Sequence, residues 1–141
     1  MKYLFFVVEC SNTFHGFGKI CEFGYVLTDD NLNKISDDDL VMSPGKGGNN
    51  RFYLKGRRGQ RDLVLAYDDS YYYEQEEFPF FFKKIKALME QSDTICFAYS
   101  SGNDLLHLNR TCKRYKLKPI HFTCYDVQKF ATALITCPET L

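Results

Sequence analysis

The sequence contains no tryptophan, no net charge and no long hydrophobic run. Its 18 Lys and Arg residues balance 18 Asp and Glu residues, so attraction of nucleic acid requires a local basic patch rather than an overall positive field. No apolar run approaches the roughly 18 residues of a membrane span, and we expect no membrane partner. The short apolar run after Lys2 ends at Glu9, where a secretory signal would carry small neutral residues.

Cysteine is present, but not in the spacing of a metal site or a disulfide framework. No two of the six cysteines form a Cys-x-x-Cys pair, no histidine pair accompanies them, and no local signature of a Cys–His nucleophile is found. Several lie inside apolar runs, as reduced thiols that pack like small hydrophobic side chains do. We therefore expect a cytoplasmic protein. The cysteines are Cys10, Cys21, Cys96, Cys112, Cys124 and Cys137.

The first strand organises the rest of the chain. Residues 2–9 read Lys-Tyr-Leu-Phe-Phe-Val-Val-Glu, six large apolar residues that end on one carboxylate. A short run rich in aromatic and β-branched residues predicts a strand buried on both faces. A carboxylate at the rim of a core is costly unless it is paired or binds a metal. Glu9 is therefore a candidate functional residue.

The rest of the pattern predicts a single α/β domain, residues 1–141. Hydrophobic residues make up 45% of the chain, enough for a sizeable core. Two further strands, at residues 19–28 and 34–42, would complete an antiparallel meander. Helix and strand then alternate. The expected elements are a helix with Pro79 in its first turn, a strand at 94–99, a helix beginning near Asp104, a strand at 120–125 and the start of a helix at 127–135. The fold class is a mixed sheet with helices packed on its faces.

Residues 43–61 form an insert of different character. The insert contains five glycines and one proline, and all its charges are positive. One interpretation is a long flexible surface loop. The other is a basic arm that holds phosphates, with aromatic residues available for base stacking. The sequence leaves both open. The candidate nucleic-acid-binding residues are Arg51, Lys55, Arg57 and Arg58.

Acidic residues follow the ends of several predicted strands. Val7 and Glu9 are two residues apart in one strand and so share a face. Asp104 sits at a strand-to-helix junction, and Asp126 follows the next strand. Open α/β sheets gather ligands at such strand ends. Converging carboxylates there would hold hard divalent ions such as Mg²⁺ or Mn²⁺.

Four motifs in this order resemble the DEDD 3′–5′ exonucleases, which include the proofreading subunits of bacterial replicative polymerases. They are Phe6-Val7-Val8-Glu9, Ile20-Cys21-Glu22-Phe23-Gly24, the segment 98–108 and Tyr125-Asp126-Val127-Gln128. The resemblance implies an RNase H-like fold and a two-metal site for which Glu9 and Asp104 are the catalytic and metal-ligating residues. Asp126 lies near the site without being one of the family's four carboxylates.

The chain departs from the family pattern at two places. The family's first Asp aligns with Val7, which offers no metal ligand. The third motif belongs downstream of Asp126 and is not found before Leu141, so we expect a C-terminally incomplete fold. The sequence leaves open whether the chain is a fragment or a natural short form.

The resemblance implies metal-dependent hydrolysis of phosphodiester bonds at the 3′ ends of single-stranded DNA or RNA. Because Val7 replaces a ligand, we expect this hydrolysis to be impaired, and whether the chain is an enzyme stays open. The alternative is a non-catalytic relative that binds nucleic acid or a protein. An incomplete sheet leaves apolar surface uncovered, and such surfaces find partners. We therefore also expect a homodimer formed through the uncovered apolar face.

Overall fold

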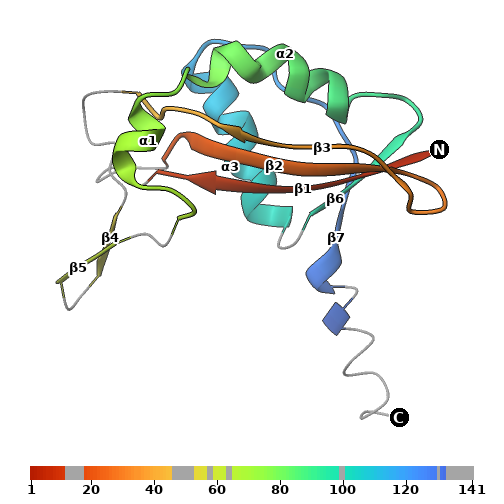
Figure 1. Cartoon of the computed structure of the whole chain (residues 1–141), viewed down its shortest axis with the longest axis horizontal. Helices are drawn as coiled ribbons and strands as arrows, with labels where there is room; N and C mark the ends of the chain where they lie inside the picture. Colours follow the sequence, from red (N-terminus) through yellow and green to blue (C-terminus); the bar gives the residue numbers. More distant parts are fainter. Residues whose placement is uncertain are drawn as a thin grey trace.

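A five-stranded mixed sheet forms the centre of the protein (Figure 1). The computed structural model describes residues 1–11, 18–45, 53–56, 59–62, 65–98, 101–129 and 131–132, and their side chains except at 53–56, 59–62 and 101–105. The strand order is β3-β2-β1-β6-β7. The strands are β1 (Lys2–Cys10), β2 (Ile20–Asp29), β3 (Lys34–Val41), β6 (Thr94–Ala98) and β7 (Cys124–Asp126). The first three are antiparallel, while β6 is parallel to β1 and β7 to β6. The predicted α/β mixed sheet is confirmed.

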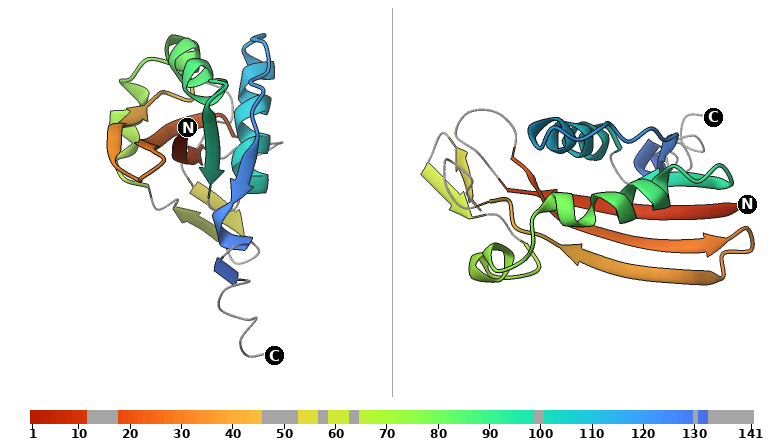
Figure 2. Two further views of the ribbon diagram at one scale, coloured as in Figure 1. Left: turned by 90° about the vertical axis from the view of Figure 1, so that its right-hand side faces the viewer. Right: turned by 90° about the horizontal axis from the view of Figure 1, so that it is seen from above.

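Two helices share one core with the sheet (Figure 2). Helix α2 (Phe78–Met89) has Pro79 in its first turn, where the missing N–H is not needed. Helix α3 is Ser101–Arg114. The core joins apolar residues of α2 and α3 to those of β1 and β2, including Leu4, Phe6, Phe23, Phe78, Ile85, Met89, Leu108 and Cys112. The aromatic and aliphatic spacing of the sequence therefore marks core positions, as the pattern predicted.

The prediction that β1 is buried on both faces is wrong. Leu4 and Phe6 are buried in the core, whereas Val7 is 51% exposed. Successive side chains of a strand point to opposite faces. Helices α2 and α3 pack on the face of Leu4 and Phe6, whereas on the other face α1 (Asp69–Tyr73) packs Tyr72 against Val41 of β3 and Val7 stays exposed. An apolar run cannot reveal this, because its composition is the same whether or not the second face is covered. We call the uncovered side the open face.

The predicted strand at 120–125 is shorter than expected, and two side chains explain why. The backbone N–H of Ile120 donates to Asn109 Oδ1 at 2.9 Å, and that of His121 donates to Glu90 Oε1 at 3.0 Å. A side chain of α3 and the side chain of Glu90, the residue after α2, thus satisfy backbone groups that would otherwise join a strand ladder. Only Cys124–Asp126 pairs with β6.

Residues 43–61 contain structure that the sequence did not predict. Strands β4 (Tyr53–Gly56) and β5 (Gly59–Asp62) pair antiparallel as a separate two-stranded sheet. A short helix, α1 (Asp69–Tyr73), follows before α2. The five described cysteines form no disulfide with one another, in line with the prediction of reduced thiols, and Cys137 lies outside the described residues. In the described part of the chain, no helix is long and apolar enough to cross a membrane.

Candidate functional site

The end of β1 places Val7 and Glu9 beside β2. Val7 pairs with Gly24 and Glu9 with Glu22. The register shifts at Glu9, because Cys10 pairs with Ile20 and leaves Cys21 as an extra residue in β2, as at a β-bulge. Glu9 is exposed, yet the protein around it raises the pKa of its carboxyl by partial desolvation. Among the described residues, no positively charged neighbour lowers the pKa of Glu9 again.

A second carboxyl next to Glu9 is buried and hydrogen-bonded. Glu22 is only 8% exposed, and the Tyr72 hydroxyl donates to its Oε2 at 3.2 Å. Burial, a hydrogen bond with Asp39 and the charges of Asp39 and Glu9 raise the pKa of Glu22 to about 7, against the opposing effect of the Tyr72 hydrogen bond. Asp39 in turn accepts a hydrogen bond from the Tyr67 hydroxyl at 3.2 Å. Glu22 and Asp39 are thus held close enough to share a proton.

This network was missed at the sequence level as a group, although Glu22 belongs to a quoted motif. Its members come from β2, β3 and the segment around α1, about 50 residues apart in the chain. One feature of the sequence could have indicated this network, namely the presence of Glu22 inside the apolar run 20–28. A charged residue in such a run calls for a partner. The partner, Tyr72, lies in a run of three tyrosines that gives no indication of which ring is buried.

The other predicted site residues are placed less completely. Asp104 lies in the first turn of α3, and its side chain is outside the described set. Asp126 ends β7, where its Oδ1 accepts from the Gln128 backbone N–H at 2.9 Å. Arg51, Arg57 and Arg58 lie outside the described residues, and Lys55 is placed only by its backbone in β4. Because β1, β6 and β7 are parallel, their carboxyl ends meet at one edge, which brings the elements carrying Glu9, Asp104 and Asp126 together.

The described side chains do not fit a two-metal centre. Among them, no group of three or more His, Cys, Asp and Glu residues is arranged to hold a metal ion. Val7 contributes no oxygen at the position next to Glu9. Glu22 Oε2 accepts from the Tyr72 hydroxyl, and Asp126 Oδ1 accepts from the Gln128 backbone N–H. Two divalent ions need more oxygen ligands than Glu9 supplies.

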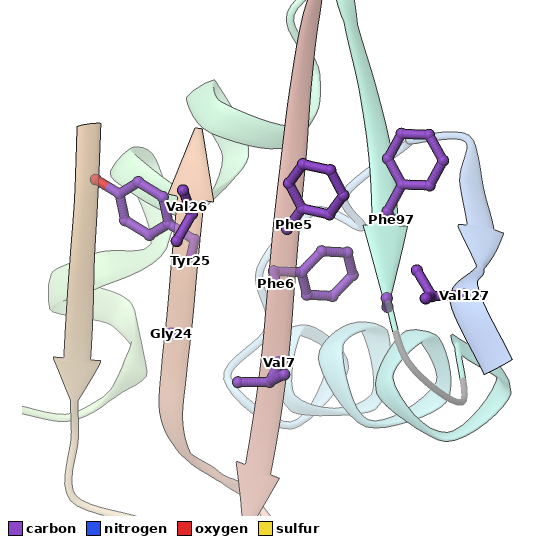
Figure 3. Close-up of a pocket in the computed structure, with 9 residues that line it drawn as sticks. Phe5, Phe6, Val7, Gly24, Tyr25, Val26, Phe97 and Val127 are labelled. Atoms are coloured by element: carbon purple, nitrogen blue, oxygen red, sulfur yellow. The ribbon is translucent and has the colours of Figure 1, made fainter. Parts of the chain in front are cut away.

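An apolar hollow occupies the position beside Val7 (Figure 3). Its volume is about 330 Å³. The rings of Phe5 and Phe97 stack at 5.3 Å between centroids, and Gly24 leaves a gap because it has no side chain. The hollow is lined by Phe5, Phe6, Val7, Gly24, Tyr25, Val26, Phe97, Ala98 and Val127. Charged and amide groups, the usual ligands of phosphates and metal ions, are missing from this lining.

Comparison with solved structures identifies the fold. Escherichia coli exonuclease I in complex with a dA16 oligonucleotide superposes with a TM-score of 0.74 at 16% identity, covering 96% of this chain and 30% of that chain. This is the RNase H-like fold. The product-bound structure of exonuclease I gives 0.74 at 15% identity, covering 96% and 32% of the two chains. The metal-free form of the E. coli exonuclease I–ssDNA complex gives 0.73 at 16% identity, covering 99% and 31%.

The chain spans about a third of the length of exonuclease I. No family model matches the sequence, and no curated protein does. At this level of identity the likeness concerns the fold. The RNase H-like architecture implied by the four motifs is thus confirmed, while the roles of Glu9 and Asp104 stay predictions.

Proposed function

We propose that this chain is a 3′–5′ exonuclease-like domain that engages the 3′ ends of single-stranded DNA or RNA, and that its phosphodiester hydrolysis is impaired. The observation that carries the proposal is Val7. Its side chain lies on the same face as Glu9, where the resemblance calls for an Asp. The fold supports the ancestry, and the solvent-exposed valine is the reason we propose that hydrolysis is impaired.

The chemistry at position 7 explains why one substitution matters so much. In the implied reaction, Mg²⁺ or Mn²⁺ ions supply the activation of water and the stabilisation of the leaving oxygen. With Val instead of Asp at position 7, the site lacks a carboxylate that would bind such an ion. Partial burial raises the pKa of Glu9, so its negative charge is less well stabilised than it would be in water.

The test is restoration of the carboxylate. Wild type and Val7→Asp are incubated with Mn²⁺ and 5′-labelled single strands of DNA and of RNA. We expect shortening from the 3′ end to be about tenfold faster or more in Val7→Asp. Val26→Asp is the matched control, because it adds an acid on the same face one strand away and should give no gain. Equal rates in wild type and Val7→Asp would contradict the proposal.

A second candidate function is binding without hydrolysis, and the hollow beside Val7 favours it. An exposed apolar surface on a sheet face is typical of an interaction site. Nucleic-acid binding by this route would depend on the insert residues Arg51, Lys55, Arg57 and Arg58, because the residues that line the hollow carry no positive charge. If neither wild type nor Val7→Asp shortens the labelled strands, binding without hydrolysis is the favoured function.

A further inference from the structure

The open face combines an apolar centre with an acidic border. Phe97 contacts three aromatic rings across the sheet: Tyr3 at 5.8 Å, Phe5 at 5.3 Å and Tyr125 at 5.8 Å between centroids. Val7 and Val26 are 51% and 37% exposed beside this row. An apolar band therefore runs across β1, β6 and β7. In α/β folds such a band is normally covered by a helix.

The strand registers place acids along one side of this band. Glu9 pairs with Glu22, Gly24 pairs with Asp39, and Val26 pairs with Asp37. Because paired residues of neighbouring strands share a face, the exposed carboxyl groups of Glu9, Asp37 and Asp39 border the apolar band. Glu22 lies on the same face but is buried against Tyr72 and adds no exposed charge. The basic residue in these rungs is Lys34, opposite Thr28 at the far end, and its Nζ already lies 3.1 Å from Asp37 Oδ2.

The acidic border favours some binding partners of the open face over others. A nucleic-acid strand lying along β3 would bring its phosphates against Asp37 and Asp39, which repel them. A second copy of this chain would bring the same acidic border, and in the described rungs of β2 and β3 Lys34 is the basic residue that offsets it. A helix that is apolar on one side and carries Lys or Arg along its flank would cover the apolar band and pair its positive charges with the acidic border.

We propose that the open face is a docking site for an amphipathic helix of a protein partner, with apolar residues over the Phe5–Phe97 hollow and basic residues over β3. The inference does not depend on hydrolysis. The face includes Val7 and Glu9, so a docked helix and a nucleic-acid 3′ end would compete for it. The inference differs from the expected homodimer in its occupant, while using the same surface.

Three synthetic helices test the proposal. The first is a helix of about 18 residues, roughly five turns, with Leu on one side and Lys on the other. The second carries Glu in place of Lys, and the third has the Leu–Lys composition in scrambled order. Binding to the whole chain is measured by fluorescence anisotropy at two salt concentrations. We expect the Leu–Lys helix to bind about tenfold or more tightly than the other two, and more weakly at high salt.

Three variants locate the binding. Val26→Lys should weaken binding of the Leu–Lys helix about tenfold or more, since it places a like charge in the band. Phe80→Lys is the matched control, because Phe80 is 70% exposed on α2 and should leave binding unchanged. Asp37→Asn should reduce the preference for Lys over Glu. Circular dichroism checks that each variant is folded.

Several outcomes would overturn the proposal. They are equal binding of the Lys and Glu helices, binding of none of the three, and insensitivity to Val26→Lys. A fourth outcome that would overturn the proposal comes from sedimentation equilibrium, which measures whether the chain dimerises. If the wild type dimerises and Val26→Lys alone makes it a monomer, the face belongs to a second copy of this chain. None of these readouts depends on Val7→Asp or on Mn²⁺, so failure here is distinguishable from failure of the proposed nuclease ancestry.

Discussion

Val7 and Gly24 face each other across β1 and β2, and a Cβ built on Gly24 would lie 3.4 Å from Val7 Cγ2 and 3.6 Å from Asp39 Oδ1. Both are ordinary van der Waals distances. The missing side chain therefore leaves room on the open face without any steric need for glycine there.

This room makes Gly24→Ala a tolerated substitution. Glycine in a strand interior costs about 0.5–1 kcal/mol relative to alanine, so we expect Gly24→Ala to keep or raise the free energy of unfolding. Urea denaturation measures it. A loss of more than about 1 kcal/mol would show that the backbone of β2 needs glycine at this position for another reason.

The carboxyl of Glu22 should make stability depend on pH near neutrality. Its pKa rises from 4.5 to about 7 in the folded protein, so the folded state holds a proton that the unfolded state releases. The contribution of Glu22 to stability is therefore greatest below about pH 4.5. This contribution falls as the pH rises from about 4.5 to about 7, and it is constant at higher pH. We expect a loss of about 1–2 kcal/mol after allowing for solvent screening.

Chemical denaturation between pH 4.5 and 8 measures this loss, with Glu22→Gln as the comparison. The Gln variant cannot ionise and should show a flatter curve. Tyr72→Phe removes a hydrogen bond that lowers the pKa of Glu22, and should shift the fall in stability to higher pH. Parallel curves for wild type and Glu22→Gln would exclude Glu22 as the source.

Thr111 fixes α3 to the start of β2, near the β-bulge that follows Glu9. This residue is fully buried. Its hydroxyl accepts from the Ile20 backbone N–H at 3.2 Å and donates to the His107 carbonyl at 2.8 Å. Thr111→Val keeps the shape but leaves the Ile20 N–H unsatisfied, so we expect a loss of about 1–3 kcal/mol. Thr111→Ser retains the hydroxyl and should lose less in the same thermal unfolding assay.

The basic residues of the insert should act through phosphates. For single strands, each neutralised phosphate adds about 0.7 to the slope of log affinity against log salt. Replacing Arg57 and Arg58 by Ala should therefore lower this slope by about 1.4 if both contact the strand. Titration of labelled single-stranded DNA at several salt concentrations gives the slope. An unchanged slope would remove these two residues from the binding surface.

The sheet and its helices could be predicted because period and composition agree along most of the chain. Leu4 and Phe6 occupy the core, as an apolar strand should. The exposure of Val7 could not be predicted, since coverage of the second face depends on which elements the fold brings to it. The network of Glu22, Asp39 and Tyr72 depends on a register and on a tyrosine rotamer that no local pattern encodes. The short β7 follows from backbone bonds to Asn109 and Glu90, which arise only after α2 and α3 have packed.

The strand order also governs how the sheet meets other molecules at its two ends. β3 lies at one edge and carries Asp37, Asp38 and Asp39, which repel a second β3 brought alongside. The opposite edge is β7, whose 3 residues offer few backbone groups for a strand to extend. Growth of the sheet from molecule to molecule, as in fibrils, is therefore opposed at both edges.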